Sequence, residues 1–321
     1  MTVTRRYILA VVLALFAATA KSATYPDRPI RFVVAFAPGG SIDLVARQFA
    51  QRLTAALGQQ VVVDNRPGAG GNLSAEIVAR SAPDGHTIYI CAPSLVVNAS
   101  LYLRLAYDPL RDFAPVTLLA SVQNALVAYP GFAVKSVKEL IALAKAKPGQ
   151  INYASTGSGS SGHLIMEMFR AQAGIDLLHI PYKAISQTTA DLISGQVSLW
   201  FPTIPGALPH IRAGRMRALA SAGAKRSPAL PDVPSMAEAA LPGFEASTWY
   251  AILTPAGVKP HVISTLNAEF LRALRAPDMQ ERLAAQGIES IGGTPEQLAA
   301  HLKSELPKWA KVVKTTGVRA E

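Results

Sequence analysis

The sequence predicts an α/β protein of two lobes, each a mainly parallel sheet flanked by helices, with crossing strands between them. Apolar runs of strand length alternate with stretches whose apolar residues recur at helical spacing. The predicted strands are continuously apolar, which is typical of parallel sheets covered on both faces. This pattern runs through about a third of the chain and then starts again without a low-complexity linker. Two joined lobes are therefore expected.

The first lobe begins with a strand at 29–36, the breaker "APGG" and a helix from Ser41, the N-cap candidate. Asp43 falls in the first turn of that helix, where the helix dipole favours a carboxylate. It could also contact a ligand amine or a bridging water. The elements predicted next are a strand at 60–65, a loop at 66–72, a helix at 73–82 and a strand at 86–92.

The strand-helix pattern restarts near residue 113. The predicted strands are 113–122, 124–130, 151–155, 177–182, 197–201, 216–222, 248–255 and 288–293. The predicted helices are 136–149, 163–174, 184–195, 207–214, 260–276, 277–287 and 294–314. We assign 24–120 and 252–321 to the first lobe and 121–251 to the second.

Residues 1–20 have the features of a secretory signal peptide. Arg5 and Arg6 precede an apolar run that is shorter than the roughly 20 residues of a membrane span, and Ala18-Thr19-Ala20 resembles a cleavage site. A retained N-terminal anchor is the alternative. We expect an exported protein that is soluble outside the cytoplasm.

Composition narrows the possible partners. The formal net charge is +10, and it falls to +8 when Arg5 and Arg6 leave with residues 1–20. Such a basic protein can attract small anions or an acidic surface. The chain has no block of Lys and Arg and no aromatic-basic interleaving, so nucleic acid is not expected. Cys91 is the only cysteine, which excludes an internal disulfide, and it is expected to be a small core residue at the end of a strand.

Gly157, Gly159 and Gly162 satisfy the dinucleotide pattern G-x-G-x-x-G between a predicted strand and a helix. A dinucleotide fold also needs an acid at the end of the next strand, ~20 residues further on. That strand ends in "HIPYK" here, and Asp176 precedes it, on the wrong side of the sheet. An exported protein also meets little nicotinamide. No cofactor is therefore expected.

The same loop suits an anion for physical reasons. Glycines and serines that lead from a strand into a helix direct free backbone N–H groups at one point, with the helix dipole behind them. Hydroxyl donors come from Thr156, Ser158, Ser160 and Ser161, and the loop has no Lys or Arg. These features favour a carboxylate over a multiply charged phosphate. A capped helix after a tight turn is the alternative.

The stretch "FVVAFAPGGSIDLVARQ" in the first lobe has the same strand-loop-helix order. Ligands of open parallel sheets bind outside the carboxyl ends of the strands. The two loops would then face each other across one cleft. We expect a small molecule there, with a carboxylate at one or both ends.

Catalytic and metal-binding patterns are missing from the sequence. No serine in the second loop fits G-x-S-x-G, and the histidines form no H-E-x-x-H or other paired ligand spacing. His163 falls in the first turn of a helix, where the dipole disfavours a protonated ring. It is expected to be a neutral hydrogen-bonding or packing residue. We expect no catalytic residue and no metal.

Ordered motifs over almost the whole chain resemble the Bug-type solute receptors of tripartite tricarboxylate transporters. They are "YPDRPIRFVV", "PGGSIDLVAR", "VVVDNRPGAGGN", "APDGHTI", "YDPLRDFAPVTLLAS", "NYASTGSGSSGHL", "IPYK", "ALPHIRAGRMRALA", "KRSPALPDVPSMAEA" and "GGTPEQLAAHLKSE". The resemblance implies a periplasmic, monomeric, non-enzymatic Venus-flytrap protein that delivers a small carboxylate to a membrane permease. A sensor subunit that presents its closed form to a membrane signalling protein is the alternative.

The resemblance also implies that the loops at 37–43 and 155–163 pinch one carboxylate, largely through backbone amides and ordered water. The candidate ligand-binding residues are Phe36, Ala37, Pro38, Gly39, Gly40, Ser41, Asp43, Ser94, Ser155, Thr156, Gly157, Ser158, Gly159, Ser160, Ser161, His163 and Thr203.

Two positions depart from many relatives. Ala184 follows "PYK" where glycine is common, and "LWFPT" has Pro202 where many relatives carry an acid. The loss of an acid beside Trp200 and Phe201 would make the far part of the pocket more apolar. Our hypothesis is a ligand whose far end lacks an ammonium group, either an aromatic acid or an aliphatic dicarboxylate. Trp200 could instead be a core residue.

Overall fold

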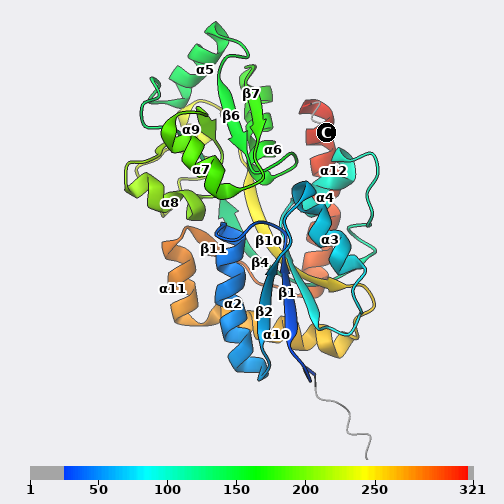
Figure 1. The fold of residues 1–321 in the computed structure, drawn as a ribbon. Coiled ribbons are helices and arrows are strands. Elements are labelled where there is room, and N and C mark those ends of the chain that lie inside the picture. The colour runs from blue at the N-terminus through cyan, green and yellow to red at the C-terminus, as the bar shows by residue number, and fades with distance from the viewer. Residues whose placement is uncertain (1–24, 317–321) are drawn as a thin grey trace, which may run out of the picture.

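The computed structural model describes residues 25–316. It contains a six-stranded sheet in the order β11-β4-β10-β3-β1-β2 and a five-stranded sheet in the order β7-β6-β8-β5-β9. Figure 1 shows the two sheets in separate lobes, one above the other, with helices on both sides of each. The predicted signal peptide lies outside the described residues.

The first lobe is built from two separate parts of the chain. The first part contains β1 (Ile30–Val34), α2 (Ser41–Leu57), β2 (Val61–Asn65), the 3-10 helix η1 (Ala69–Gly71), α3 (Asn72–Ala79), β3 (Thr87–Cys91), α4 (Ser94–Leu101) and β4 (Phe113–Gln123). The second contains β10 (Ser247–Pro255), α10 (Pro260–Arg275), α11 (Pro277–Ala285), β11 (Ile288–Ser290) and α12 (Pro295–Thr316). Strands β1 to β4 run in one direction, and β10 and β11 run in the other.

The second lobe is one continuous part of the chain. It contains β5 (Ala125–Ala128), α5 (Val137–Ala146), β6 (Asn152–Ser155), α6 (Ser161–Ala173), β7 (Leu178–Pro181), α7 (Ile185–Ser194), β8 (Leu199–Trp200), α8 (Ile204–Arg212), β9 (Arg217–Ser221) and α9 (Met236–Ala239). Here β6 to β9 share a direction and β5 opposes them. Four strands of each sheet thus share a direction, but the sheets are mixed. β2-β1-β3 and β7-β6-β8 pair in parallel, as predicted, and the remaining neighbours are antiparallel because β10, β11 and β5 run the other way.

Two strands carry the chain between the lobes. Strand β4 continues through Asn124 directly into β5, and β10 brings the chain back beside β4. Asn124 donates from Nδ2 to the Phe201 carbonyl at 2.9 Å and accepts from the Thr248 hydroxyl at 2.8 Å. The predicted lobe boundaries, after 120 and before 252, fall inside β4 and β10, which pair with each other from Gln123–Ser247 to Phe113–Pro255. Where along these strands the lobes divide remains a prediction.

Each sheet is covered by apolar residues on both faces. In the first lobe, Phe270 of α10 packs against Phe32 of β1 and Phe49 of α2, with ring centroids 6.0 and 5.7 Å apart. These two-sided cores explain why the strands are apolar throughout. Cys91 is fully buried and free, and burial raises the pKa of its thiol. The prediction of a core role for Cys91 is confirmed.

Helix α4 was not predicted from the sequence. Its apolar residues do not follow a helical stripe, because the segment is buried nearly all round, with Leu95, Val96, Val97 and Asn98 all enclosed. A helix without a polar face gives no periodic signal. The loop predicted at 66–72 is also more ordered than expected, since it contains η1.

Candidate ligand-binding site

A cavity of about 420 Å³ lies between the lobes. The chain reaches it just after β1, β3, β6, β7 and β8, at the carboxyl ends of these strands, where ligands of open α/β sheets bind. The cavity is lined by Phe36, Pro38, Gly39, Gly40, Ser41, Ile42, Ala92, Asn124, Thr156, Ser160, Ser161, Gly162, Ile185, Ser186, Thr189, Trp200, Phe201, Pro202, Thr203, Gly206, His210, Thr248 and Tyr250.

Asp43 shapes the loop between β1 and α2. Its Oδ2 accepts the Gly39 N–H at 2.9 Å, and Asn65 Nδ2 donates to both Asp43 Oδ1 and the Phe36 carbonyl at 3.0 Å. Burial of the carboxyl opposes its ionisation, but hydrogen bonds from Arg47, Gly39 and Asn65 outweigh burial and lower the pKa of Asp43. Asp43 does not line the cavity. The contacts favour a structural role for Asp43 in the loop over a contact with a ligand.

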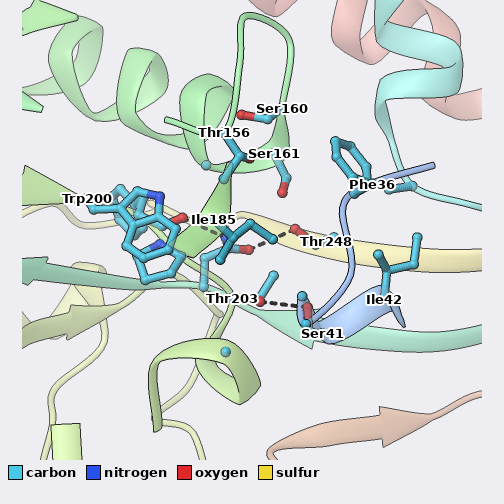
Figure 2. A pocket seen from close by; sticks show the side chains of 18 of the residues that line it. Phe36, Ser41, Ile42, Thr156, Ser160, Ser161, Ile185, Trp200, Thr203 and Thr248 are labelled. Carbon is cyan, nitrogen blue, oxygen red and sulfur yellow. Dashed lines mark hydrogen bonds between the residues drawn. The ribbon is translucent and has the colours of Figure 1, made fainter. Parts of the chain in front are cut away.

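Ser41 does not cap α2 as the sequence predicts. Gly40 takes the N-cap position with extended backbone angles, and Ser41 is the first helical residue. The Ser41 hydroxyl instead lies 2.7 Å from Thr203 Oγ1 and 2.6 Å from the Tyr250 hydroxyl. Figure 2 shows the bond to Thr203, which connects the two lobes. No side chain caps α2, so backbone N–H groups of its first turn remain available to a ligand.

The loop between β6 and α6 forms the facing wall. Ser160 takes the N-cap position of α6, but its side chain makes no capping bond and its buried Oγ has no hydrogen-bond partner. Thr156, Ser160 and Ser161 all line the cavity. A second uncapped helix start therefore lies opposite the first.

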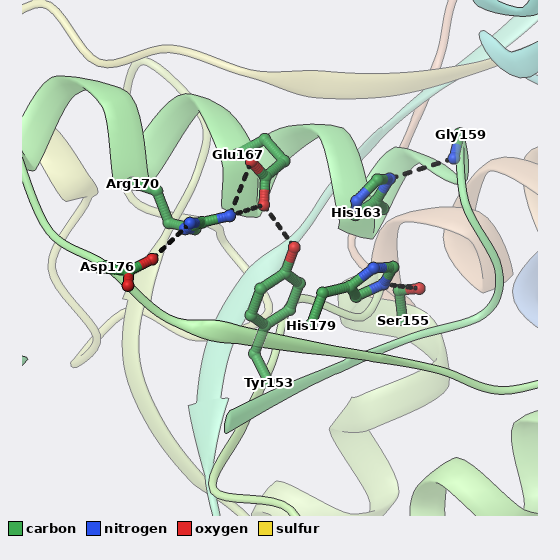
Figure 3. A network of polar contacts seen from close by, with 8 residues as sticks. All are labelled: Tyr153, Ser155, Gly159, His163, Glu167, Arg170, Asp176 and His179. Carbon is green, nitrogen blue, oxygen red and sulfur yellow. Dashed lines mark hydrogen bonds and ion pairs between the residues drawn. The ribbon is translucent and has the colours of Figure 1, made fainter. Parts of the chain in front are cut away.

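Two stacked histidines support this second loop from behind (Figure 3). His163 Nδ1 accepts the Gly159 N–H at 3.1 Å, and its ring stacks on His179 at 4.1 Å. His179 Nε2 lies 2.7 Å from Ser155 Oγ, which accepts the Gly157 N–H at 3.2 Å. Burial, followed by the charges of His179 and Arg170, lowers the pKa of His163 to about 3. The prediction that His163 is neutral is confirmed.

The contacts that support the β6–α6 loop continue along α6 to the surface of the protein. Tyr153 stacks on His179 with centroids 4.9 Å apart and donates its hydroxyl to Glu167. Arg170 holds Glu167 with bonds of 2.7 and 2.9 Å and reaches Asp176 at 2.7 Å. Figure 3 shows these side chains as a chain of contacts along α6. The network fixes α6, and with it the loop that faces the ligand cavity.

The predicted site residues divide into two groups. Those that line the cavity are Phe36, Pro38, Gly39, Gly40, Ser41, Thr156, Ser160, Ser161 and Thr203. Those outside its lining are Ala37, Asp43, Ser94, Ser155, Gly157, Ser158, Gly159 and His163. In the second group, Ser94 is buried at the start of α4 next to Gly71. Ser155 and His163 hold the loop from inside.

Several lining residues were not predicted from the sequence. These are Ile42, Ala92, Asn124, Gly162, Ile185, Ser186, Thr189, Gly206, His210, Thr248 and Tyr250. The start of α7 follows β7 as α6 follows β6, so the same strand-loop-helix order could have predicted Ile185 and Ser186. Asn124, Thr248 and Tyr250 come from the crossing region, which carries no such signal. Trp200 both lines the cavity and belongs to the core, being 5% exposed.

The cavity wall contains no Asp, Glu, Lys or Arg. Its polar groups are hydroxyls, an amide, backbone N–H groups and the imidazole of His210. The starts of α2, α6, α7 and α8 all contribute to the lining, and each brings the positive end of a helix dipole. This wall suits an anion held by neutral donors. Among residues 25–316, no group of His, Cys, Asp and Glu side chains is placed to hold a metal ion.

Comparison with known proteins assigns the chain to a family. The family described as "Tripartite tricarboxylate transporter family receptor" matches residues 45–318. Protein BugT of Bordetella pertussis is 40% identical over 319 residues, covering 97% of this chain and 98% of BugT. None of the helices within 25–316 combines the length and apolar character needed to cross a bilayer.

Two solved structures are similar throughout. R. palustris Rpa4515 with adipate has a TM-score of 0.89 and 36% identity, covering 92% of this chain and 100% of that chain. Periplasmic binding protein BugD has a TM-score of 0.88 and 35% identity over the same shares. The two-lobed α/β fold is thus that of periplasmic binding proteins. The chain belongs to the receptor family of the tripartite tricarboxylate transporters, the Bug-type receptors that its motifs resemble.

Proposed function

We propose that this protein captures a small organic carboxylate between its lobes in the periplasm and delivers it to a membrane permease of the tripartite tricarboxylate type. The observation that carries the proposal is the cavity wall. Two uncapped helix starts face each other across a space of about 420 Å³, and no charged side chain lines it. Volumes of this order suit small molecules.

A carboxylate fits this wall better than a cation or a phosphate does. Its two oxygens can accept from both loops at once, and the helix dipoles favour its charge. A phosphate would bring a further charge without an Arg or Lys to meet it. An ammonium group would find no acid in the wall. The ligand classes that fit are aromatic acids and aliphatic dicarboxylates, and the similar protein Rpa4515 was solved with adipate, a dicarboxylate.

Contacts across the cleft support capture by closure. Besides the bond between Ser41 and Thr203, a Cβ added at Gly40 would lie 2.7 Å from Ile185, and one added at Gly70 would lie 2.7 Å from the Ser158 carbonyl. The lobes therefore touch at several places in this closed form. A ligand that touches both lobes favours the closed form and shifts the population toward it.

The site favours binding without catalysis. Ser155 and His179 form a serine-histidine pair, but Ser155 is fully buried, its oxygen accepts the Gly157 N–H, and it lies outside the cavity lining. A nucleophile must reach its substrate. Ser155 instead holds the loop.

The test is thermal unfolding of the protein, freed of bound ligand by unfolding and refolding, with carboxylates, aromatic acids and amino acids. A ligand at about 100 times its Kd stabilises the folded state by about 2.7 kcal/mol, or roughly 4 °C in Tm for a chain of this size. We expect a selective rise with one class of carboxylate. Phosphate and neutral amides are the controls, and a panel in which no carboxylate raises Tm would contradict the proposal.

A further inference from the structure

His210 is the one histidine in the cavity wall, and apart from the Tyr250 phenol it is the only ionisable side chain there. Its Nδ1 is buried and has no hydrogen-bond partner. Because Nδ1 is closed to solvent, a ligand in the cavity would meet the ring at its other nitrogen, Nε2. His210 lies in the motif "ALPHIRAGRMRALA" that the chain shares with the receptor family, but no role was predicted for it from the sequence.

The position of His210 follows from the geometry of α8. Thr203, Gly206 and His210 are spaced three and four residues apart, so they share one face of the helix, and all three line the cavity. Thr203 bonds to Ser41, which places this end of α8 beside the β1–α2 loop. His210 lies seven residues further on, about 10 Å along the helix axis at 1.5 Å per residue. It therefore lies on the part of the wall away from that loop.

We propose that His210 selects ligands that carry a second carboxylate at the end away from the β1–α2 loop, so that the receptor prefers aliphatic dicarboxylates to aromatic or aliphatic monocarboxylates. This inference rests on the proposed function. A ligand held at the loops by one carboxylate would reach His210 through a short carbon chain. The wall beside that chain is apolar, with Ile185, Trp200 and Pro202.

The electrostatic setting agrees with this assignment. Burial lowers the pKa of His210, and the positive charge of Arg215 lowers it further. The cavity wall has no acid that would oppose this effect. The imidazole is thus neutral at pH 7, and a ligand carboxylate beside it would raise the pKa of His210 and strengthen the bond.

The experiment measures Kd by calorimetry for succinate, glutarate and adipate, each paired with the monocarboxylate of the same chain length, and for benzoate. We expect the best dicarboxylate to bind about 10–100-fold more tightly than its partner, the range of a hydrogen bond to a charged group. His210→Phe should remove this preference, so that each dicarboxylate binds no more tightly than its monocarboxylate partner. His210→Gln keeps a neutral hydrogen-bond donor and should retain part of the preference for dicarboxylates. His261→Gln, at an exposed histidine, is the control.

A second readout does not need a variant. In the wild-type protein, the NMR titration of the His210 ring should show a higher pKa with the preferred dicarboxylate and no such rise with its monocarboxylate partner. A preference that survives in His210→Phe overturns the inference, as does benzoate binding as tightly as every dicarboxylate. In both cases the proposal that the protein is a carboxylate receptor is unaffected. If no carboxylate binds the wild-type protein, the proposed function fails, and this inference fails with it.

Discussion

The hydroxyl of Ser41 takes part in two hydrogen bonds, one to Tyr250 of β10, a strand of the six-stranded sheet that also contains β1, and one to Thr203 across the cleft. The first bond satisfies a fully buried phenol and can form whether or not the lobes are closed. The second exists only where the lobes meet. One hydroxyl thus contributes to the structure of a lobe and to the free energy of closure, and these contributions can be separated by changing its partners.

Thr203→Val removes the bond across the cleft and leaves the bond between Ser41 and Tyr250 intact. A neutral hydrogen bond contributes about 0.5–1.5 kcal/mol, so ligand affinity should fall by about 2–10-fold, with little change in the Tm of the ligand-free protein. Calorimetry and thermal unfolding measure the two effects. Thr203→Ser keeps a hydroxyl and should bind as the wild type does. An unchanged affinity in Thr203→Val would show that this bond does not stabilise the closed form.

At the scale of elements, the loop at 66–72 and α4 close the cleft against the β6–α6 loop. Gly70 of η1 approaches the Ser158 carbonyl, and a Cβ added at Gly159 would lie 2.6 Å from Leu101 and 2.8 Å from Asn98 of α4. Both glycines also have positive φ. The sequence predicted 66–72 only as a loop. The contact of this loop with the second lobe is a further reason for glycine at position 70.

Gly70→Ala tests this contact against a matched variant, Gly58→Ala. The two glycines have φ of 60° and 70°, so alanine costs a similar backbone strain of roughly 1 kcal/mol at each, but a Cβ at Gly58 meets nothing within 4 Å. We expect similar falls in ligand-free Tm. Only Gly70→Ala should also lose affinity, by about tenfold or more, because its Cβ forces the lobes apart. Equal affinity losses in both variants would mean that strain alone is responsible.

The β1–α2 and β6–α6 loops could be predicted because the pattern that marks them lies in consecutive residues. Glycine and serine between a strand and a helix predict free N–H groups in the loops at 37–43 and 155–163. Of these loops, Gly39, Gly40, Ser41, Thr156, Ser160 and Ser161 do line the cavity, whereas Gly157, Ser158 and Gly159 do not. The N-cap prediction for Ser41 is wrong because its partners, Thr203 and Tyr250, lie 162 and 209 positions away. His210 and the crossing-strand residues Asn124 and Thr248 depend on tertiary placement. No local pattern predicts them.

At the scale of the whole molecule, stability should depend on pH through buried histidines. The folded-state pKa of His163 is about 3, below the ordinary histidine value of 6.5, because the ring is buried. Between these values the unfolded chain binds a proton that the folded protein does not, so stability is lost as the pH falls from about 6.5 toward 4. The lowered pKa values of His210 and His301 act in the same direction.

His163→Asn offers an oxygen that can still accept the Gly159 N–H, and it cannot be protonated in this range. Urea unfolding at several pH values should show a flatter dependence of the unfolding free energy between pH 6.5 and 4 than in the wild type. The exposed His261→Asn should leave the slope unchanged. A His163→Asn slope equal to that of the wild type would show that His163 is not responsible.

Because the hydrogen-bond donors of the cavity wall are uncharged, salt should affect the rate of ligand capture and the rate of ligand release differently. The chain as a whole is basic, with a formal net charge of +10, and the attraction of exposed charges for an approaching anion weakens as ionic strength rises. In the proposed complex, the anion inside the closed cavity would be held by backbone and hydroxyl dipoles, which mobile ions cannot reach. Added salt should therefore slow the arrival of the solute and leave its residence time nearly constant.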